Sequence, residues 1–397
     1  MPKAARPGRS RCSGPTTLDE IRAATAGLCA TLVGIGLARF AYTPLLPALI
    51  EGGWFDPPGA AYLAAANLVG YLAGAMGARS VMGRIRPTSL VRAMMLVAAC
   101  TFLACALRLG FSWFLFWRFL SGLSGGLLMV AVAPTVLAAV RSDRRGRIGG
   151  IMFAGVGIGI VAAGTLVPQL LRIGLVAAWL GLGLLALLLT AWAWPRWPDD
   201  APLARRTSRA RALPGWPTLA VSLVYALFAL GLVPHMVFLV DFVARGLGWG
   251  IATGAVFWVL YGLGAVAGPF AAGWLGDRQG FARGLSIALA LQLAVVLIPV
   301  LAPHAIPLAV SALVMGAFTP GMPALVLGRL AEVSHDRDEH AAWAFATTAF
   351  ALTQAAGAYG YSWLYARSHG YAALFVTAAV ALGAALVLSL ARSGRRS

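Results

Sequence analysis

Residues 34–50 read GIGLARFAYTPLLPALI, and the apolar segment around them, about 22–50, is long enough to cross a lipid bilayer as a helix. Arg39 lies in the middle of this segment, and Pro44 and Pro47 follow it. A permanent cation at the centre of a membrane helix costs about 2.5–3.5 kcal/mol on insertion scales. That cost is tolerable where the side chain meets a partner or a water-filled cavity, so Arg39 is the first candidate for a functional residue.

The composition of the whole chain agrees with a membrane environment. Hydrophobic residues make up 60% of the 397 residues and charged residues 11%, far from the balance of a soluble domain. Twelve apolar stretches of spanning length lie at about 22–50, 59–82, 88–108, 112–140, 148–172, 174–195, 215–243, 250–275, 283–302, 305–330, 340–366 and 370–391. Backbone polar groups in hydrocarbon must be satisfied within their own segment, and these stretches are too long for barrel strands. The sequence therefore predicts an all-α integral membrane protein with twelve transmembrane helices.

The net charge is +18, and the positions of the basic residues along the chain indicate the membrane topology. Most basic residues lie at the two ends and on alternate loops, whereas the opposite loops hold only Arg108, Arg172, Arg245 and Arg367. The positive-inside rule then predicts that both termini and the basic linker 196–214 are cytoplasmic, in the plasma membrane (the inner membrane of a bacterium). No nucleic-acid-binding fold accompanies the charge, so a nucleic-acid partner is not expected.

No cofactor or metal site is expected from the sequence. The cysteines fit no metal or redox spacing, and they are Cys12, Cys29, Cys100 and Cys105. The run SHDRDEH (334–340) has two histidines and three carboxylates, but without ligand spacing on a regular element it is better explained as a solvated turn. No GxxxxGK[ST] phosphate loop occurs, which excludes an ATP-driven pump of that type.

The chain repeats itself. Gly36-Leu37 recurs as Gly231-Leu232, an offset of 195 residues (36 to 231), and Gly70 and Gly74 recur as Gly264 and Gly268 at an offset of 194 (70 to 264). This spacing predicts a tail (1–21), two parallel six-helix halves (22–195 and 215–391) joined by the linker 196–214, and a second tail (392–397). Glycines on these helices are expected to let backbones approach closely, and they are Gly70, Gly74, Gly155, Gly159, Gly264 and Gly268.

Several motifs resemble those of the major facilitator superfamily of transporters. GWLGDRQGFAR (273–283) is similar to the superfamily's loop signature, WRFLSGLSGG (117–126) to its fourth-helix motif and GVGIGIVAAG (155–164) to its glycine-rich fifth helix. The first helix, followed by Trp54, resembles the YbfB/YjiJ-type branch, whose members are mostly inferred transporters of unknown substrate. Charges at the cytoplasmic helix ends are expected to form a gate, with ordinary loop solvation as the alternative. The candidate gating residues are Gly273, Asp277, Arg278, Gly280 and Arg283, with Arg84 in the degraded first-half copy.

Polar residues within the spans are the candidates for substrate binding. Tyr42 and Thr43 stand three and four positions after Arg39, so on a regular helix the three would share a face and could bind an anion or a hydroxylated ligand. The alternative is a structural cation bonded to backbone carbonyls. Further candidates are Asn67, Tyr71, His235, Tyr261 and Gln354, each of which could equally form an interhelical hydrogen bond.

Three ionisable residues are candidates for coupling transport to protons. The resemblance implies such a role for Arg118, yet no carboxylate lies in the middle of the first half, so a packing role is an equal alternative. His235 is predicted by the repeat to lie beside Arg39, and histidine titrates near physiological pH. Asp241 lies near the outer end of the same span, where it could also be solvated or paired with Arg245.

The sequence thus predicts a secondary active transporter, monomeric and not an enzyme, that works by alternating access and is coupled to protons. Two buried arginines against few buried acids favour a small organic anion as substrate. Efflux of drugs or sugars, with structural arginines, is the alternative within the class. A membrane-embedded enzyme or a receptor is a remote alternative, because no cluster of nucleophiles, acids or metal ligands is visible.

Overall fold

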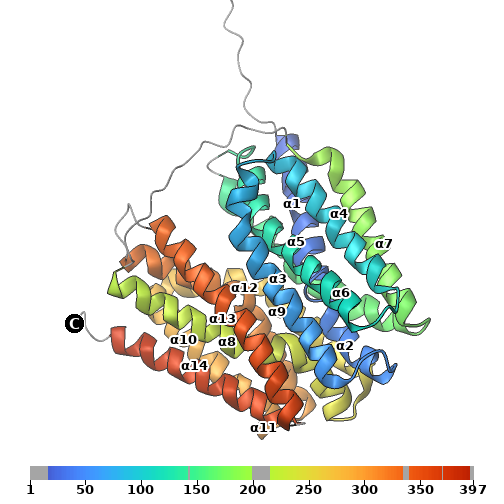
Figure 1. The fold of residues 1–397 in the computed structure, drawn as a ribbon. Helices are drawn as coiled ribbons and strands as arrows, with labels where there is room; N and C mark the ends of the chain where they lie inside the picture. The colour runs from blue at the N-terminus through green and yellow to red at the C-terminus, as the bar shows by residue number, and fades with distance from the viewer. Residues whose placement is uncertain (1–16, 142–143, 199–214, 334–338, 369, 394–397) are drawn as a thin grey trace, which may run out of the picture.

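The computed structural model describes residues 17–141, 144–198, 215–333, 339–368 and 370–393, and every regular element in these ranges is a helix (Figure 1). The first half contains α1 (Thr17–Thr31), η1 (Leu32–Leu37), α2 (Tyr42–Glu51), α3 (Pro57–Met82), α4 (Pro87–Cys105), α5 (Phe111–Leu137), α6 (Arg145–Leu171), α7 (Leu175–Ala193) and η3 (Trp194–Arg196). The second half contains α8 (Trp216–Asp241), η4 (Phe242–Gly246), α9 (Gly250–Gln279), α10 (Phe281–Val296), α11 (Ile298–Leu301), α12 (Ala305–Val333), α13 (Glu339–Ser368) and α14 (Ala372–Ser393). The predicted all-α class is confirmed.

Eleven stretches of the described chain are long and apolar enough to cross a membrane. The twelfth predicted span is α13, which has 30 residues but is less apolar because it is rich in alanine, threonine and tyrosine. The short breaks predicted at 108–112 and 172–174 are chain reversals, and each contains a glycine with positive φ, Gly110 (91°) and Gly174 (142°). These glycines explain how so few residues separate two spans.

Some predicted boundaries fall outside the described residues. The first tail is described only from Thr17, the linker only up to residue 198, and the second tail only up to residue 393. The first span begins at Thr17, earlier than the predicted residue 22, and α1, η1 and α2 carry it to Glu51. Most of the run 334–340 also lies outside the described residues.

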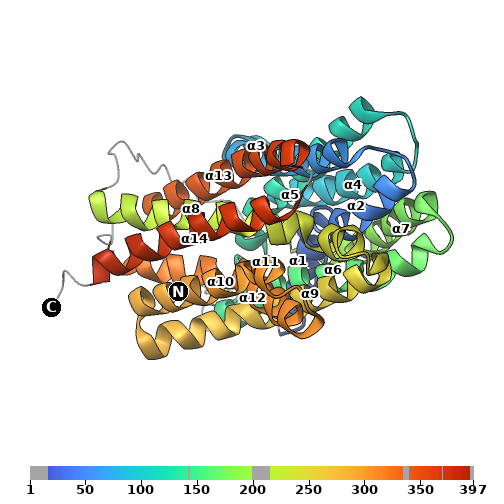
Figure 2. The same ribbon diagram turned by 90° about the horizontal axis from the view of Figure 1, so that it is seen from below.

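The two halves lie at an angle to each other. In Figure 1 the helices of the first half run from the top towards the lower right, and those of the second half run from the left towards the same region. We call the ends near residues 17, 198 and 216 the linker end and the opposite ends the far end. The halves are spread apart at the linker end and meet towards the far end, where α3 packs against α13 and α6 against α9 (Figure 2).

Close backbone contacts hold the helices within each half. A Cβ atom on Gly70 or Gly74 of α3 would overlap a carbonyl oxygen of α5, and one on Gly264 or Gly268 of α9 would overlap a carbonyl oxygen of α12. The same pair of glycines therefore sits in the same kind of seam in both halves. Gly159 of α6 likewise leaves no room for a side chain against the backbone of η1.

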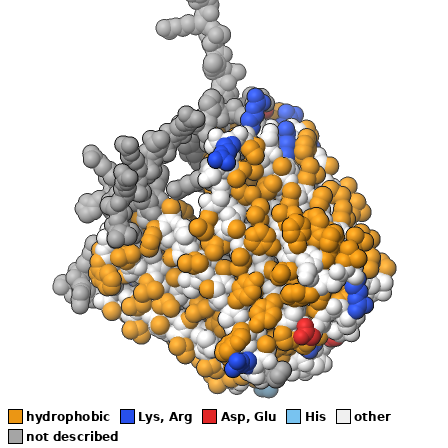
Figure 3. All heavy atoms as spheres, in the orientation of Figure 1, with side chains coloured by type: hydrophobic (Ala, Val, Ile, Leu, Met, Phe, Trp, Pro, Cys, Tyr) orange, Lys and Arg blue, Asp and Glu red, His pale blue; other side chains and the backbone are white. Residues whose placement is uncertain are grey.

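The outer surface is suited to lipid. Figure 3 shows a face covered by hydrophobic side chains, with Lys and Arg side chains gathered at its margins. Large apolar side chains such as Phe270 and Val380 are about two-thirds exposed, which in water would be costly. The chain is an integral membrane protein with many spans.

Candidate functional site

Arg39 lies between the halves, at a break in the first span. The chain leaves η1 at Leu37, passes through a turn and enters α2 at Tyr42, so Arg39 is carried on non-α backbone. Its Nη2 donates to Oε1 of Gln354 on α13 at 2.5 Å and to Sδ of Met236 on α8 at 3.3 Å. A side chain of the first half is thus bound to two helices of the second.

Aromatic rings surround the Arg39 guanidinium. Its Cζ atom lies 4.9 Å from the centre of the Tyr71 ring and 5.3 Å from that of Phe40. The hydroxyl groups of Tyr71, Tyr225 and Tyr261 are the titratable neighbours within its electrostatic reach. Ring faces attract cations, so these side chains partly replace the water that Arg39 has lost.

No acidic group balances this charge in the part of the chain that the structure describes. The ion pairs found there join other arginines to Glu20, Asp241 and Glu332. The Nε atom of Arg39 is buried and also lacks a hydrogen-bond partner. Arg39 is thus a partly buried cation whose best acceptor is a neutral amide and whose Nε–H is free to donate. These features suit the binding of an anion.

Tyr42 and Thr43 do not form a shared polar patch with Arg39. The Tyr42 hydroxyl donates to the carbonyl oxygen of Ala60 at 2.9 Å, and the Thr43 hydroxyl donates to that of Met236 at 2.7 Å. The predicted shared face assumed a regular α-helix, whereas the π-helical turn η1 and the following break change the angle between successive side chains. Thr43 instead adds a further hydrogen bond between the halves.

Arg118 and Asn67 stabilise the break itself. The carbonyl oxygen of Ala38 accepts hydrogen bonds from Arg118 Nη1 (3.1 Å), Ser121 Oγ (3.0 Å) and Asn67 Nδ2 (3.4 Å). The Arg118 guanidinium also lies 4.2 Å from the centre of the Tyr42 ring and is almost fully buried. These contacts favour the packing alternative for Arg118.

His235 lies on a different side of α8 from Met236. Its Nε2 is 2.8 Å from Ser311 Oγ on α12, and its ring meets that of Phe375 on α14 edge to face. Ser311 donates its own hydroxyl hydrogen to the carbonyl of Val295, so it must accept from His235, and Nε2 then carries the proton. The remaining atom, Nδ1, is buried without a partner.

Asp241 belongs to a separate polar cluster at the far end. Its carboxylate accepts from Tyr371 (2.6 Å), from Arg245 (3.2 Å) and more weakly from Tyr365 (3.4 Å). The side chain of Asp241 is completely buried, although Arg245 is partly exposed. All members come from the second half, so the cluster fixes α8 to α13 and to the start of α14.

Of the aromatic residues near Arg39 described next, Tyr261 was a candidate from the sequence, whereas the others were not recognised. Tyr225 of α8 stacks on Phe350 of α13 at 4.5 Å and lies 6.2 Å from Trp343, measured between ring centres. On α9, Trp258 stacks on Tyr261 at 4.8 Å, and the Tyr261 hydroxyl is 2.5 Å from that of Thr319. The spacing of Trp343, Phe350 and Gln354 on one helical face was the available signal.

The candidate gating residues lie at the linker end. The side chains of Asp277, Arg278, Arg283 and Arg84 are exposed, and Gly280 ends α9 with a φ of 76°. Arg278 lies over the ring of Trp274 at 4.8 Å. Within the described residues, no ion pair links these side chains to the other half.

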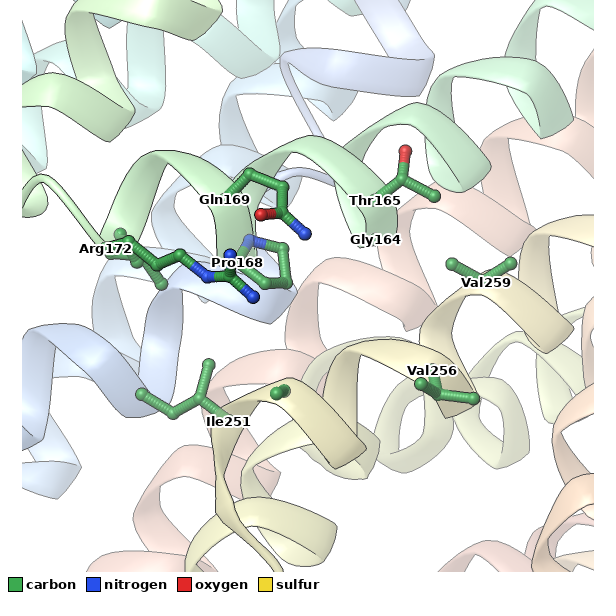
Figure 4. A pocket seen from close by; sticks show the side chains of 10 residues that line it. Gly164, Thr165, Pro168, Gln169, Arg172, Ile251, Val256 and Val259 are labelled. Atoms are coloured by element: carbon green, nitrogen blue, oxygen red, sulfur yellow. The ribbon is translucent and has the colours of Figure 1, made fainter.

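A groove of about 560 Å³ runs along the seam between α6 and α9 at the far end (Figure 4). One side is lined by Thr165 and Gln169 of α6 and by Arg172, which directly follows this helix, and the other by Val256 and Val259 of α9. Its polar groups are exposed rather than buried. The groove is thus an opening in the seam and is separate from the Arg39 site.

Comparison with solved structures supports the fold. The chain is similar to a bacterial homologue of the human lysosomal transporter Spinster in its inward-facing and occupied conformation, with a TM-score of 0.70 and 16% identity over 96% of this chain and 98% of that one. The inward-facing and unoccupied form of that homologue gives a TM-score of 0.67 and 14% identity over 95% of each chain. Comparison with curated proteins gives no match.

Comparison with protein families gives a match over nearly the whole chain. The family described as "Uncharacterised MFS-type transporter YbfB" matches residues 31–390, which include Arg39, Gln354 and both halves. The fold with twelve predicted spans agrees with that match. The chain therefore belongs to the YbfB family of major facilitator superfamily transporters.

Proposed function

We propose that this transporter carries a small organic anion by alternating access, with Arg39 as the group that binds the anion. The observation that supports this most is the position of Arg39 between the halves without a described acidic partner. An amide oxygen is a weaker acceptor than a carboxylate, so an incoming anion can take the place of Gln354. Because Gln354 belongs to the other half, this exchange also releases one connection between the halves.

Contacts between the halves favour opening at the linker end in this conformation. Arg39 and Thr43 bind the second half, and the rings of Tyr62 and Tyr359 lie 5.9 Å apart still nearer the far end. The gating residues at the linker end are exposed. With the predicted topology, in which both termini are cytoplasmic, the site faces the cytoplasm.

Proton coupling is the second part of the proposal. Asp241 is a buried carboxylate shared with Arg245 and Tyr371, and His235 has an uncommitted ring nitrogen. Both groups lie within the second half, so protonation would act on the packing of α8 against its neighbours rather than on the substrate directly. We place the transporter in the plasma membrane as a monomer.

Uptake into proteoliposomes tests the assignment of Arg39. Arg39→Ala should reduce the affinity for organic anions by about ten- to a hundredfold, since a hydrogen bond to a charged group is worth about 1.5–3 kcal/mol. Arg39→Lys should restore it only in part, because lysine lacks the planar fork. Arg367→Ala is the matched control, as Arg367 also lies over an aromatic ring but is exposed at the far end. Unchanged anion transport by Arg39→Ala, or transport of sugars or neutral drugs alone, would overturn the proposal.

A further inference from the structure

We infer that the Arg39 site takes aromatic monocarboxylates, a narrower class than organic anions in general. The inference rests on the proposed function and specifies its substrate. It follows from three independent features of Arg39 and of the part of α13 that precedes Gln354: the number of available cations, the arrangement of aromatic rings and an unpaired hydroxyl.

Among the residues that the structure describes, one cation between the halves is available to a substrate. Arg39 has an uncommitted Nε and a replaceable amide partner. The other arginine in the middle of the membrane, Arg118, is 2% exposed and already bound to the carbonyl of Ala38 and the ring of Tyr42. A dianion would therefore bring a second charge to Arg39 without a partner for it among the described residues, which is costly in a membrane interior. One carboxylate matches the site.

The walls on the linker side of Arg39 are aromatic. Tyr225, Phe350 and Trp343 form a stack in which Tyr225 is buried, whereas Phe350 and Trp343 are partly exposed. An aromatic ring attached to the bound carboxylate would pack against the exposed parts of Phe350 and Trp343.

The distance between the two features sets the size of the ligand. Phe350 lies four positions before Gln354 on α13, which at 1.5 Å per residue is about 6 Å along the helix. A carboxylate at Arg39 with a ring beside Phe350 corresponds to an aryl acid with a short aliphatic spacer. Trp343 lies a further seven positions away, about 10 Å, and leaves room for a second fused ring.

An unpaired hydroxyl lies between the two aromatic residues. Thr347 stands four positions after Trp343 and three before Phe350, on the same face of α13. Its Oγ1 is buried without a hydrogen-bond partner. Buried hydroxyls are normally paired, so this atom is a candidate contact for a ring N–H or hydroxyl group of the substrate.

Binding to the purified full chain in lipid nanodiscs tests the inference with four probes. They are 3-phenylpropionate, its saturated counterpart 3-cyclohexylpropionate, the neutral 3-phenylpropanamide and the dianion phenylsuccinate. We expect 3-phenylpropionate to bind most tightly, and Phe350→Leu to weaken it about two- to thirteenfold, the range of an aromatic pair, with little effect on the cyclohexyl acid. Phe345→Leu, on the exposed face of the same helix, is the matched control and should leave the preference unchanged.

The outcomes separate the inference from the function on which it rests. Equal binding of the phenyl and cyclohexyl acids, tighter binding of phenylsuccinate, or a phenyl preference that survives Phe350→Leu would overturn the aromatic assignment. In those cases anion binding that is still lost in Arg39→Ala would leave the proposed function intact. If no acid binds in a manner that depends on Arg39, both the aromatic assignment and the proposed function are refuted.

Discussion

Replacing Gln354 by glutamate is the sharpest test of the Arg39 site, because it changes one atom of the contact between the halves. Gln354→Glu keeps the shape of the side chain but places a carboxylate where an amide oxygen now lies 2.5 Å from Arg39 Nη2. Two unit charges about 4 Å apart attract each other by about 4 kcal/mol at an effective dielectric constant of 20. Desolvation of the new carboxylate cancels part of this gain.

We expect the internal carboxylate to compete with the substrate. If about half of the attraction remains, the affinity for anions falls by one to two powers of ten, since about 1.4 kcal/mol corresponds to tenfold. The same attraction should hold the halves in the present conformation and raise the melting temperature. The assay is anion uptake in proteoliposomes together with thermal unfolding in detergent. Gln354→Asn, which shortens the side chain without adding charge, is the control. Wild-type anion affinity in Gln354→Glu would refute the assignment of Arg39 as the anion-binding group.

Three further predictions concern packing and coupling. Arg118→Ala should destabilise the protein by about 2–5 kcal/mol in denaturant unfolding, because it removes a charged hydrogen bond and a buried cation–π contact. Gly268→Ala should lower the melting temperature, since its Cβ would overlap a backbone oxygen of α12, whereas Gly383→Ala, with open space around it, should not. Asp241→Asn should abolish accumulation driven by a pH gradient but preserve substrate exchange, and accumulation that persists would place coupling elsewhere.

The sequence predicted the helices and the importance of Arg39 because these follow from hydropathy and from the cost of a charge in hydrocarbon. It also identified Tyr71 and Gln354 as polar residues in apolar spans, and the structure brings both to Arg39. The contact with Gln354 could not be predicted, since the two residues are 315 positions apart and meet only through the packing of the halves. The contact with Tyr71 joins neighbouring spans of the first half, but it depends on how these helices are rotated about their axes.

The internal repeat could not predict which side chains of α8 point towards Arg39. The offset of 195 residues aligned His235 with Phe40, yet Met236 is the residue that reaches Arg39, and His235 contacts Ser311 instead. A repeat fixes which helix lies where, but rotation about the helix axis depends on local hydrogen bonding. The π-helical turn and break around Arg39 have no sequence signature as clear as a run of apolar residues.

The groove between α6 and α9 bears on the thermodynamics of opening. Its walls include the aliphatic side chains of Val256 and Val259, of which Val256 is exposed. Lipid tails are as apolar as valine, so where such side chains part into lipid the separation carries little of the penalty that exposure to water would bring. At those positions the hydrophobic effect holds the halves together less than it holds an interface in water. The population of each conformation then depends on a few polar contacts such as that of Arg39 with Gln354. A solute that exchanges a single hydrogen bond can shift that population severalfold, because about 1.4 kcal/mol already changes it tenfold.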